Sequence, residues 1–385
     1  MSNARDSSII RLSKSAVGEE EVRAVSAVVQ RGYLGMGPVV FEFEELIAKR
    51  LGVEKSGVVC VSSGTAALHL ALEALDIGIG DEVVVPSITY VASFQAIEAT
   101  GAVAVPCDCD PYSGLMCLDG LRALVTERTR AVLYVHYASI TSGISEVREF
   151  CRRKDLRLIE DAAHSFGTDV SALWGEYPPD ILCFSFDGIK NITSGEGGCL
   201  VCTDPVVISR VSDARLLGVE NDSGKRKNMR RSWDFDVSHR GFRYHMSDIM
   251  AALGVSQIRK LDAFASERRS REKFYHEAFE NCDGLDRVRR HSPHEVPHIY
   301  PILVDKSVRD TLRREMLNAG IETGWHYKAN HLHTIFRKNC RGCLPGAEEF
   351  SSRTMSLPLH TNLSTEDQTR VVACLLSILR SHIGN

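Results

Sequence analysis

Apolar residues near the start of the chain recur at intervals of three and four positions. Over residues 17–53 this spacing continues on both sides of a glycine-containing stretch, QRGYLGMGP. Such intervals keep apolar side chains on one face of an α-helix, whereas glycine interrupts helical segments. The pattern predicts two helices joined by a glycine-containing turn.

From about residue 57 to residue 205 the chain alternates between short apolar runs and helical segments. The runs are rich in β-branched residues and read GVVCVSS, DEVVVPS, RAVLYVHY, LRLIEDAA, ILCFSFD and GCLVCTD. Near-continuous apolar runs separated by helices are typical of parallel strands buried on both faces. We therefore predict an α/β fold with a three-layer, mostly parallel sheet.

The pattern changes twice more toward the C-terminus. Residues from about 206 to 245 are rich in Arg, Ser, Asp and Asn with little periodicity, which predicts an exposed excursion before a helix near Met246 and a candidate contact with a partner subunit. The remainder, with HIYPILV, AGIETGWHY, TMSLPLH and a terminal helix capped by Ser364 or Thr365, predicts a compact α+β unit. We expect a large α/β domain over residues 1–250, including the N-terminal helices, and a smaller α+β domain over residues 251–385.

Composition excludes a general attraction to nucleic acid or anionic membranes. The 385 residues include 46 basic and 50 acidic side chains, for a formal net charge of -4. The first residues, MSNARDSSII, lack the layout of a signal peptide, and no apolar stretch of roughly 18 residues follows. We expect a cytoplasmic protein that contacts neither nucleic acid nor membrane, so local charge must carry any anion recognition.

Cysteine and histidine clusters raise the question of a metal site. The chain has twelve cysteines, and without a secretory signal these are expected to be reduced thiols with no structural disulfides. Cys340 and Cys343 have zinc-type spacing, but a structural zinc site needs four ligands and no second close pair lies nearby. His291, His294 and His298 lie in a proline-interrupted stretch that we interpret as a solvated loop leading into a strand. We expect no metal.

Three segments carry candidate chemistry, and the first is VSSGTAALHLAL. A strand ends at Ser62 and Ser63, and Gly64 and Thr65 open a helix. The free N–H groups and positive dipole at a helix start suit a phosphate. Ser-Gly-Thr is equally common as an ordinary turn and cap, so this segment alone leaves both readings open.

The second and third segments supply a carboxylate and an amine. Asp161 in LIEDAAHSFG ends an apolar strand, where it either pairs with a cationic cofactor group or caps a helix. Lys190 in CFSFDGIKNITSGEGG follows the next strand, and a desolvated lysine can form a Schiff base with an aldehyde. Ser185, at that strand's end, can give its hydroxyl to a phosphate. A surface lysine is the weaker interpretation, because the flanking segments are apolar or glycine-rich.

The three segments follow one another along the chain as phosphate cradle, carboxylate and lysine. This ordered set is more specific than any one of the segments alone. With these segments the chain resembles the DegT/StrS family of sugar-nucleotide aminotransferases, pyridoxal-phosphate (PLP) enzymes of the aspartate-aminotransferase-like fold type I. The resemblance runs from GYLGMGPVVFEFEE through DEVVVPSITYVAS, IEDAAHSFG and GFRYHMSDIMAALG to SLPLH. It implies PLP bound to Lys190 and a homodimer with shared active sites.

The resemblance also implies roles for other residues. Asp161 matches the partner of the cofactor's pyridine nitrogen, and His164 matches the polar residue beside the ring. Tyr90 falls where the family places an aromatic ring against the cofactor, although packing within a strand is the alternative. The phosphate-binding positions match Gly64, Thr65 and Ser185.

Other positions depart from the family or face its substrate pocket. Arg243 stands where many members carry an Asn that reaches the phosphate of the neighbouring subunit's cofactor, and it could instead contact the nucleotide diphosphate or form an ion pair. Ser139 and Ala329 replace a common Gly and Pro. The segment facing the substrate pocket contributes the candidate contacts His326, Tyr327, Lys328 and His331, for which a solvated strand end is the alternative.

The implied reaction moves an amino group from L-glutamate to a nucleotide-linked keto-deoxyhexose. We expect an NDP-4-keto-6-deoxyhexose, with an NDP-3-keto-6-deoxyhexose or a keto-inositol as alternatives, and a role in aminosugar synthesis for O-antigen or another polysaccharide. Some relatives instead dehydrate deoxysugars and carry His at the lysine position, so Lys190 argues against that reaction. A non-catalytic PLP-binding or sugar-nucleotide-binding regulator is the reading from another class, and the set of Lys190, Asp161, Ser185 and Tyr90 disfavours it.

Overall fold

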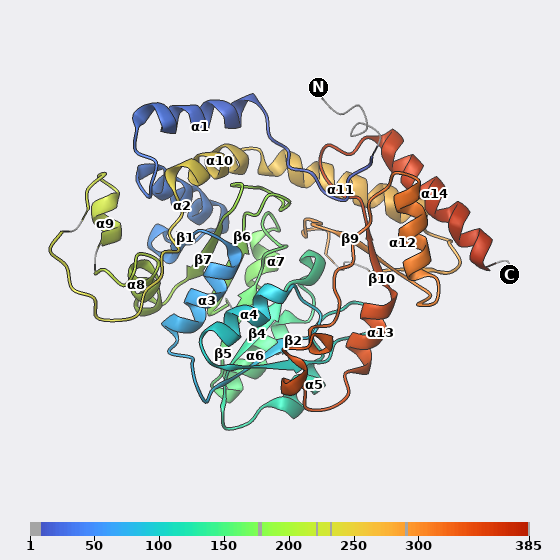
Figure 1. Ribbon diagram of the computed structural model, residues 1–385, viewed down its shortest axis with the longest axis horizontal. Coiled ribbons are helices and arrows are strands. Elements are labelled where there is room, and N and C mark those ends of the chain that lie inside the picture. Colours follow the sequence, from blue (N-terminus) through green and yellow to red (C-terminus); the bar gives the residue numbers. More distant parts are fainter. Residues whose placement is uncertain (1–8, 176–178, 221, 232, 289–291, 384–385) are drawn as a thin grey trace.

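A computed structural model describes residues 9–175, 179–220, 222–231, 233–288 and 292–383 (Figure 1). Its central sheet has the strands β1 (Val58–Val61), β2 (Glu82–Pro86), β3 (Val103–Cys107), β4 (Thr129–Val135), β5 (Arg157–Asp161), β6 (Ile181–Ser185) and β7 (Gly198–Cys202). The spatial order is β1-β7-β6-β5-β4-β2-β3. β7 runs antiparallel to both neighbours, and the other pairings are parallel. The predicted mostly parallel sheet is confirmed.

Helices cover both faces of this sheet, which gives the predicted three layers. The helices are α1 (Glu19–Arg31), α2 (Pro38–Leu51), α3 (Gly64–Ala74), α4 (Val91–Ala99), α5 (Leu118–Leu124), α6 (Ile144–Lys154), α7 (Val170–Trp174), α8 (Pro205–Ala214), α9 (Asp222–Arg226), α10 (Asp248–Ile258), α11 (Leu261–Ala278), α12 (Arg309–Asn318), α13 (Pro345–Arg353) and α14 (Thr365–Ile383), with short 3₁₀ helices at Lys55–Gly57, Tyr137–Ser139, Asn330–Leu332 and Arg337–Asn339. Side chains of a strand alternate between faces. Val59 and Val61 of β1 therefore pack in the core that contains α3, α4 and α8, whereas Val58 and Cys60 join the core that contains α2 and α10.

Two elements differ from the predicted layout. α8 occupies the start of the predicted excursion at 206–245, because Val207, Val211 and Ala214 form a helical stripe that is buried against the sheet. Asp204 caps this helix by accepting a hydrogen bond from the Val206 N–H at 2.9 Å. The exposed excursion therefore begins only after α8. β3 was absent from the predicted strands.

The C-terminal part of the chain forms a second, smaller unit. Its sheet has the order β10-β9-β8, with β8 (Leu285–Arg287), β9 (Tyr300–Val304) and β10 (Thr354–Leu357) all antiparallel. α12 and α14 pack against it (Figure 1). α14 has the predicted Ser364 cap, whose Oγ accepts from the Asp367 N–H at 3.0 Å. α10 spans the proposed boundary at residue 250 and packs with α1 and α2, so the exact division into domains stays a prediction.

The N-terminal segment before α1 is built into this second unit. The Ile10 N–H donates to the Gly320 carbonyl at 2.8 Å, and the Ile10 carbonyl accepts from the Glu322 N–H at 2.9 Å. Further along, the Leu12 carbonyl accepts from the Leu359 N–H at 3.1 Å. Segments more than 300 residues apart in sequence therefore lie side by side.

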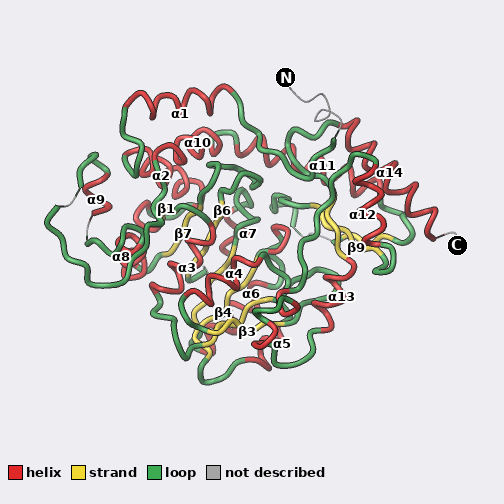
Figure 2. The backbone as a smooth tube through the Cα atoms, viewed as in Figure 1, coloured by secondary structure: helices red, strands yellow, loops and turns green. Residues whose placement is uncertain are grey.

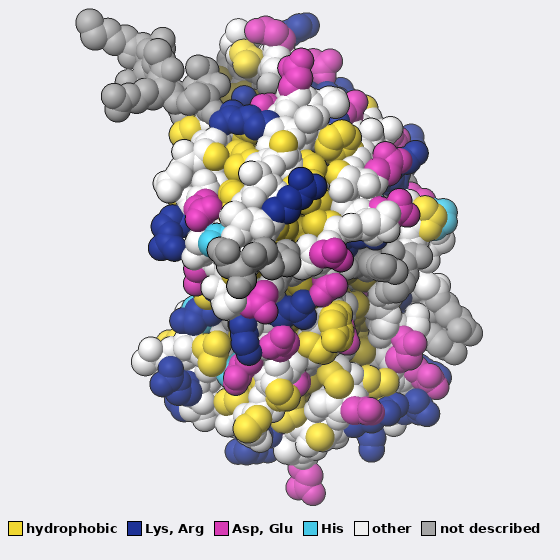
Figure 3. Space-filling view, turned by 90° about the vertical axis from the view of Figure 1, so that its right-hand side faces the viewer, with side chains coloured by type: hydrophobic (Ala, Val, Ile, Leu, Met, Phe, Trp, Pro, Cys, Tyr) yellow, Lys and Arg dark blue, Asp and Glu magenta, His cyan; other side chains and the backbone are white. Residues whose placement is uncertain are grey.

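The surface agrees with the near-neutral composition. Figure 3 shows acidic and basic side chains interspersed over one face.

All twelve cysteines are free, and most are buried. Within the described residues no helix is long and apolar enough to cross a bilayer, and no group of three or more His, Cys, Asp and Glu side chains is arranged to hold a metal ion.

A buried ion pair fixes β5, the central strand that ends at Asp161. Arg148 on α6 donates from Nε and Nη2 to the two carboxylate oxygens of Glu160, at 2.7 and 2.8 Å. His136 Nε2 lies 2.8 Å from the same carboxylate. Burial raises the pKa of Glu160, but the bonds from His136 and Arg148 outweigh it and leave that pKa below its usual value. Glu160 and Asp161 are adjacent, so they point to opposite faces of the sheet.

Removing the guanidinium should destabilise the fold. Arg148→Met leaves the buried Glu160 charge without its main partner, which we expect to reduce the free energy of unfolding by about 3 to 5 kcal/mol. Thermal unfolding followed by circular dichroism measures the loss. Arg153→Met removes an exposed arginine on the same helix, which pairs with Glu149, and should change stability by less than about 1 kcal/mol. Equal effects of the two substitutions would contradict the role of the buried pair.

Candidate active site

A cavity of about 470 Å³ opens at the carboxyl ends of the parallel strands. Val135, Asp161 and Ser185, the last residues of β4, β5 and β6, reach its wall together with the first turn of α3. Nine of the twelve residues selected from sequence line it, namely Gly64, Thr65, Tyr90, Asp161, His164, Ser185, Lys190, His326 and Tyr327. The carboxyl edge of a parallel sheet is where α/β proteins bind ligands.

The other three selected residues lie outside this cavity. Arg243 is exposed and lines a smaller cavity of about 160 Å³ beside Arg226 and Arg231. Lys328 is exposed, whereas His331 is buried. His331 Nδ1 lies 2.7 Å from a serine hydroxyl, that of Ser87. The roles of all twelve residues stay predictions.

The start of α3 forms a narrow cradle. Ser63 caps the helix, its Oγ accepting from the Ala66 N–H at 3.1 Å, and the residues that follow face the cavity. Gly64 lies so close to Ser185 that a Cβ on it would stand 2.9 Å from the Ser185 Cβ. Only glycine allows this approach, which brings a helix N-terminus and a hydroxyl together in an arrangement suited to a phosphate.

Asp161 is a buried carboxylate with an ordered set of donors. Ser93 Oγ donates to Oδ2 at 2.9 Å, and the Ala163 N–H donates to Oδ1 at 3.1 Å. Thr89 Oγ1 lies 2.9 Å from Ser93 Oγ and extends the chain of hydroxyls. Burial raises the pKa of Asp161, and these donors oppose that rise. Sequence reasoning missed Ser93 and Thr89, because only the fold brings the start of α4 to the end of β5.

Lys190 is carried by a tight turn after β6. The Lys190 N–H donates to the Asp187 carbonyl at 3.0 Å, and the Ile189 N–H donates to Asp187 Oδ1 at 3.1 Å. Ser15 Oγ, from the N-terminal segment, donates to the Gly188 carbonyl. Burial lowers the pKa of Lys190, while Asp161 and Asp187 act in the opposite direction. The lysine is therefore held in place and has a weakened hold on its proton.

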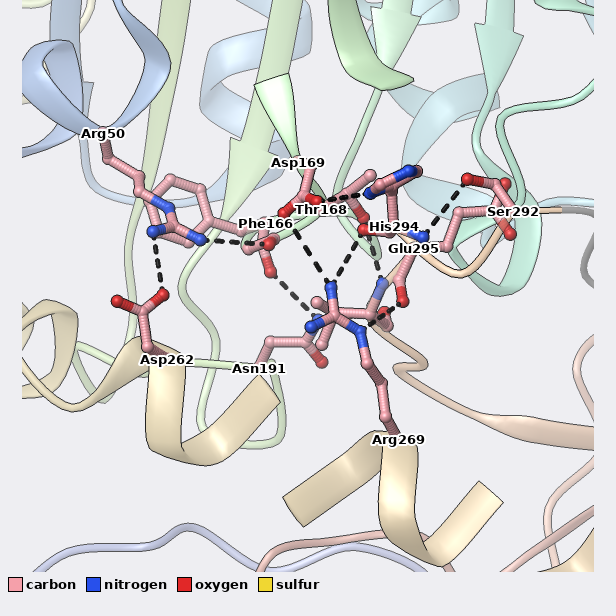
Figure 4. Close-up of polar contacts among 12 residues, drawn as sticks. Arg50, Phe166, Thr168, Asp169, Asn191, Asp262, Arg269, Ser292, His294 and Glu295 are labelled. Atoms are coloured by element: carbon pink, nitrogen blue, oxygen red, sulfur yellow. Dashed lines mark hydrogen bonds and ion pairs between the residues drawn. The ribbon is translucent and has the colours of Figure 1, made fainter. Parts of the chain in front are cut away.

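The residue after the lysine anchors this turn to two other segments (Figure 4). Asn191 Nδ2 donates to the Phe166 carbonyl at 3.0 Å and more weakly, at 3.4 Å, to the Val296 carbonyl. In the same region Asp169 Oδ2 and His294 Nδ1 lie 2.7 Å apart. The Lys190 turn, the loop after β5 and the segment before β9 are thus joined by side-chain contacts.

Tyr90 and the histidines form the remaining wall. Tyr90 is 60% exposed and stands just before α4, so packing within a strand is excluded for it. The hydroxyl of Tyr327 lies 3.1 Å from His164 Nε2, and His164 Nδ1 accepts from the Ala138 N–H at 3.3 Å. The rings of His164 and His298 are 4.5 Å apart.

Of the two histidines that the structure describes in the histidine-rich stretch, the interpretation as a solvated loop is confirmed for one. His294 is exposed, but His298 is 4% exposed and lines the cavity, because it lies two residues before the buried strand β9. His291 lies outside the described residues. Asp187 and Glu196 also line the cavity and were missed, although both lie within the segment that identified Lys190.

The chain is similar to known proteins over nearly its whole length. The model of the DegT/DnrJ/EryC1/StrS aminotransferase family matches residues 15–376. A relative from Saccharopolyspora spinosa, dTDP-4-dehydro-2,3,6-trideoxy-D-glucose 4-aminotransferase, is 36% identical and covers 98% of each chain. The aminotransferase TlmJ from Streptoalloteichus hindustanus superposes with a TM-score of 0.88 at 32% identity, covering 97% of this chain and 99% of its own. Spr1654 from Streptococcus pneumoniae has been solved in PMP and PLP forms and is 26% identical. The PMP form superposes with a TM-score of 0.88 and covers 98% of this chain and 99% of its own. The PLP form superposes with a TM-score of 0.87 and covers 97% of this chain and 99% of its own.

The buried imidazole of His326 in the cavity wall should make the free energy of unfolding depend on pH. Burial, with Lys190 and Arg313 nearby, lowers the pKa of His326 to about 4, whereas an unfolded histidine titrates near about 6.5. Between these values the unfolded chain binds more protons, so the free energy of unfolding falls as pH falls through this window. We expect His326 to account for on the order of 2 to 3 kcal/mol. Chemical denaturation of wild type and His326→Gln from pH 7 to pH 4 measures the difference.

The comparison with a surface histidine isolates this effect. His382→Gln changes an exposed residue on α14 and serves as the control for replacing a histidine at the surface. Parallel curves for wild type and His326→Gln over the whole range would contradict the low pKa of His326.

Proposed function

Since the chain belongs to the DegT/DnrJ/EryC1/StrS aminotransferase family, we propose that it moves an amino group from L-glutamate to a nucleotide-linked keto-deoxyhexose. It is a sugar aminotransferase, and its cofactor is pyridoxal 5′-phosphate. The observation that carries the proposal is the meeting of Lys190, Asp161 and the α3 cradle in one cavity.

The residues present fit the parts of this cofactor. Gly64 and Ser185 approach each other closely enough to hold a phosphate between a helix N-terminus and a hydroxyl. Asp161, buried and oriented by two donors, would pair with the ring nitrogen, and Lys190 would hold the aldehyde carbon. When bound, the cofactor supplies an electron-withdrawing ring that stabilises negative charge on the adjacent substrate carbon. Tyr90 would cover one face of that ring.

The chain's own groups move the protons. Burial lowers the pKa of Lys190, which increases the neutral fraction of its amine at a given pH. In the first half of the exchange Lys190 Nζ removes the proton from the carbon that carries the amino group of glutamate. In the second half it delivers a proton to the carbon that carried the keto oxygen of the sugar. Asp161 remains the fixed counter-charge through both halves.

The sugar we propose is an NDP-4-keto-6-deoxyhexose. The name of the Saccharopolyspora spinosa relative, a 4-aminotransferase of a dTDP-linked 4-keto sugar, supports amination at C4. His326 and Tyr327 present polar groups to the cavity that suit sugar hydroxyls. We also propose that the product is an amino-deoxysugar for a polysaccharide such as O-antigen, made in the cytoplasm.

The unit that we propose is a homodimer with shared active sites. Arg243 lies in the excursion after α8, most of which is loop (Figure 2). The same excursion exposes Trp233, 87% accessible, and Phe235, 52% accessible. Large apolar side chains exposed together are typical of surfaces that bind another protein. We propose that Arg243 reaches across such an interface to the phosphate of the neighbouring cofactor.

The donor half-reaction tests the proposed activity. Protein loaded with PLP and given L-glutamate should release 2-oxoglutarate while the visible absorbance of the bound cofactor changes to that of the pyridoxamine form. Lys190→Ala should lose this conversion by at least about 1,000-fold, because both the anchor and the proton carrier are removed. Coupled assay of 2-oxoglutarate measures it, and a panel of NDP-keto-sugars then identifies the acceptor. A glutamate-dependent conversion that survives in Lys190→Ala would exclude the proposed role.

Subunit mixing tests the shared site. Lys190→Ala and Arg243→Ala should each be inactive alone, yet co-expressed chains should regain roughly a quarter of wild-type activity. Half of the dimers would be mixed, and each mixed dimer would hold one intact site. Differently tagged subunits allow the mixed dimer to be purified and assayed. Absence of any recovery in that dimer would show that Arg243 does not act across the interface.

A further inference from the structure

One corner of the active-site cavity contains a histidine that lacks a partner. His298 is 4% exposed and lines the cavity, and its Nδ1 has no hydrogen-bond partner among the described residues. Buried polar atoms in folded proteins are nearly always hydrogen-bonded. Because His298 also belongs to the cavity wall, a polar group of a bound ligand is a candidate partner for its imidazole.

A buried cation stands behind this histidine. Arg268 on α11 is 3% exposed, and its Nη1 donates to the carbonyls of Pro297, His298 and Leu359 at 3.3, 3.2 and 3.3 Å. Its Nε has no partner within the part of the chain that the structure describes. Carbonyl oxygens satisfy hydrogen bonds but carry no net charge, so the positive charge of Arg268 is not neutralised by them. A buried charge of this kind favours an anion nearby.

The segment that carries His298 is held firmly by the same helix. Arg269, the next residue of α11, donates from Nε to the Glu295 carbonyl at 3.1 Å and from Nη2 to the His294 carbonyl at 3.0 Å (Figure 4). Because Arg268 binds the carbonyls of Pro297 and His298, consecutive arginines hold the chain at both ends of the stretch from residue 294 to residue 298. The position of the His298 imidazole is therefore set before any ligand arrives.

We propose that His298, supported by Arg268, binds the α-carboxylate of the amino-acid donor beside Lys190. This corner, made of His298, Arg268, His326 and Lys190, places a buried guanidinium and two imidazoles near the lysine. His298 donates the hydrogen bond, and Arg268 supplies charge from behind without touching the ligand. The inference rests on the proposed function, because it assigns the donor's place in that site.

The geometry of the two substrates decides which anion fits. In an amino acid the carboxylate is bonded directly to the reacting carbon, so it must lie next to Lys190 Nζ when that carbon does. In a nucleotide-linked 4-keto sugar the diphosphate is attached across the ring from the keto carbon and lies farther from the lysine. A cationic corner adjacent to Lys190 therefore matches the carboxylate of the donor.

A histidine also suits a site that must accept both substrates in turn. Burial, together with Lys190, His164, Arg268 and His326, lowers the pKa of His298 well below its usual value. The ring is neutral in the empty cavity and can take up a proton when a carboxylate binds. When the uncharged sugar ring occupies the cavity, the neutral imidazole can pair with a hydroxyl group. A guanidinium in the same place would be left with an unpaired charge.

Binding of glutarate tests the corner directly. Glutarate has both carboxylates of glutamate but no amino group, so it binds to the PLP-loaded enzyme without reacting. Calorimetry should show that His298→Leu weakens glutarate binding about tenfold or more, because a hydrogen bond to a charged group is lost. His298→Gln, which keeps a donor, should retain part of the affinity. His382→Gln, which changes an exposed histidine on α14 outside the cavity lining, should bind glutarate as the wild type does.

Kinetics of the separate half-reactions complete the test. His298→Leu should raise the KM for L-glutamate about tenfold while changing the KM for the keto-sugar, measured from the pyridoxamine form, less than about twofold. Unchanged glutarate affinity in a His298→Leu protein with wild-type cofactor absorbance and melting temperature would overturn the proposal, as would equal losses in both half-reactions. Absence of glutarate binding to the wild type would overturn it too. If no keto-sugar accepted the amino group, the proposed acceptor would be rejected. The glutarate and glutamate measurements would still test the role of His298.

Discussion

Burial removes Asp161 from water almost entirely and Lys190 in part, and ionisable groups lose more solvation free energy on burial than any other side chains. Hydrogen bonds within the protein replace part of the solvation that is lost. Asp161 receives hydrogen bonds from Ser93 and from a backbone N–H, and the backbone of the Lys190 turn is bonded to Asp187. Burial raises the pKa of the carboxylate and lowers that of the amine, so each group holds its charge less firmly than in water. That weakening favours the proton exchange that we propose for the lysine.

The sheet explains how the two groups come to share one space. Parallel strands end at the same edge, so residues that close successive strands meet there although many residues separate them in sequence. β5 has to position two adjacent carboxylates at once. Glu160 needs hydrogen-bond partners on one face of the sheet, while Asp161 faces the cavity on the other. The Arg148 pair therefore does more than stabilise the fold: it fixes the strand whose last residue is the carboxylate that we propose to pair with the cofactor. Loosening one face of β5 is expected to disturb the other.

The order of motifs along the chain was enough to predict the layers, the sheet and nine of the residues that line the cavity. The strands that carry Asp161 and Ser185 were identified because each contains a short apolar run between helical segments. β3 was not predicted, because Pro106 interrupts its apolar run. The structure shows that β3 is an edge strand, where a proline is tolerated. Ser93, His298 and Arg268 could not be recognised, because their importance comes from contacts between distant segments and no local pattern records these. His298 even belonged to a stretch whose proline content suggested a solvated loop.

The N-terminal segment has a consequence for how the protein is made. Ile10 and Leu12 pair with residues near 320 and 359, and Ser15 binds the turn that holds the lysine. A ribosome delivers the first of these segments long before the last, so the start of the chain must wait for almost the entire sequence to be translated. Contacts of such long range are also the slowest to form, because a large loop has to close before they can. Assembly of the active site is therefore expected among the final events of biosynthesis, and a prematurely ended chain would lack the pairing partners that fix the position of its lysine.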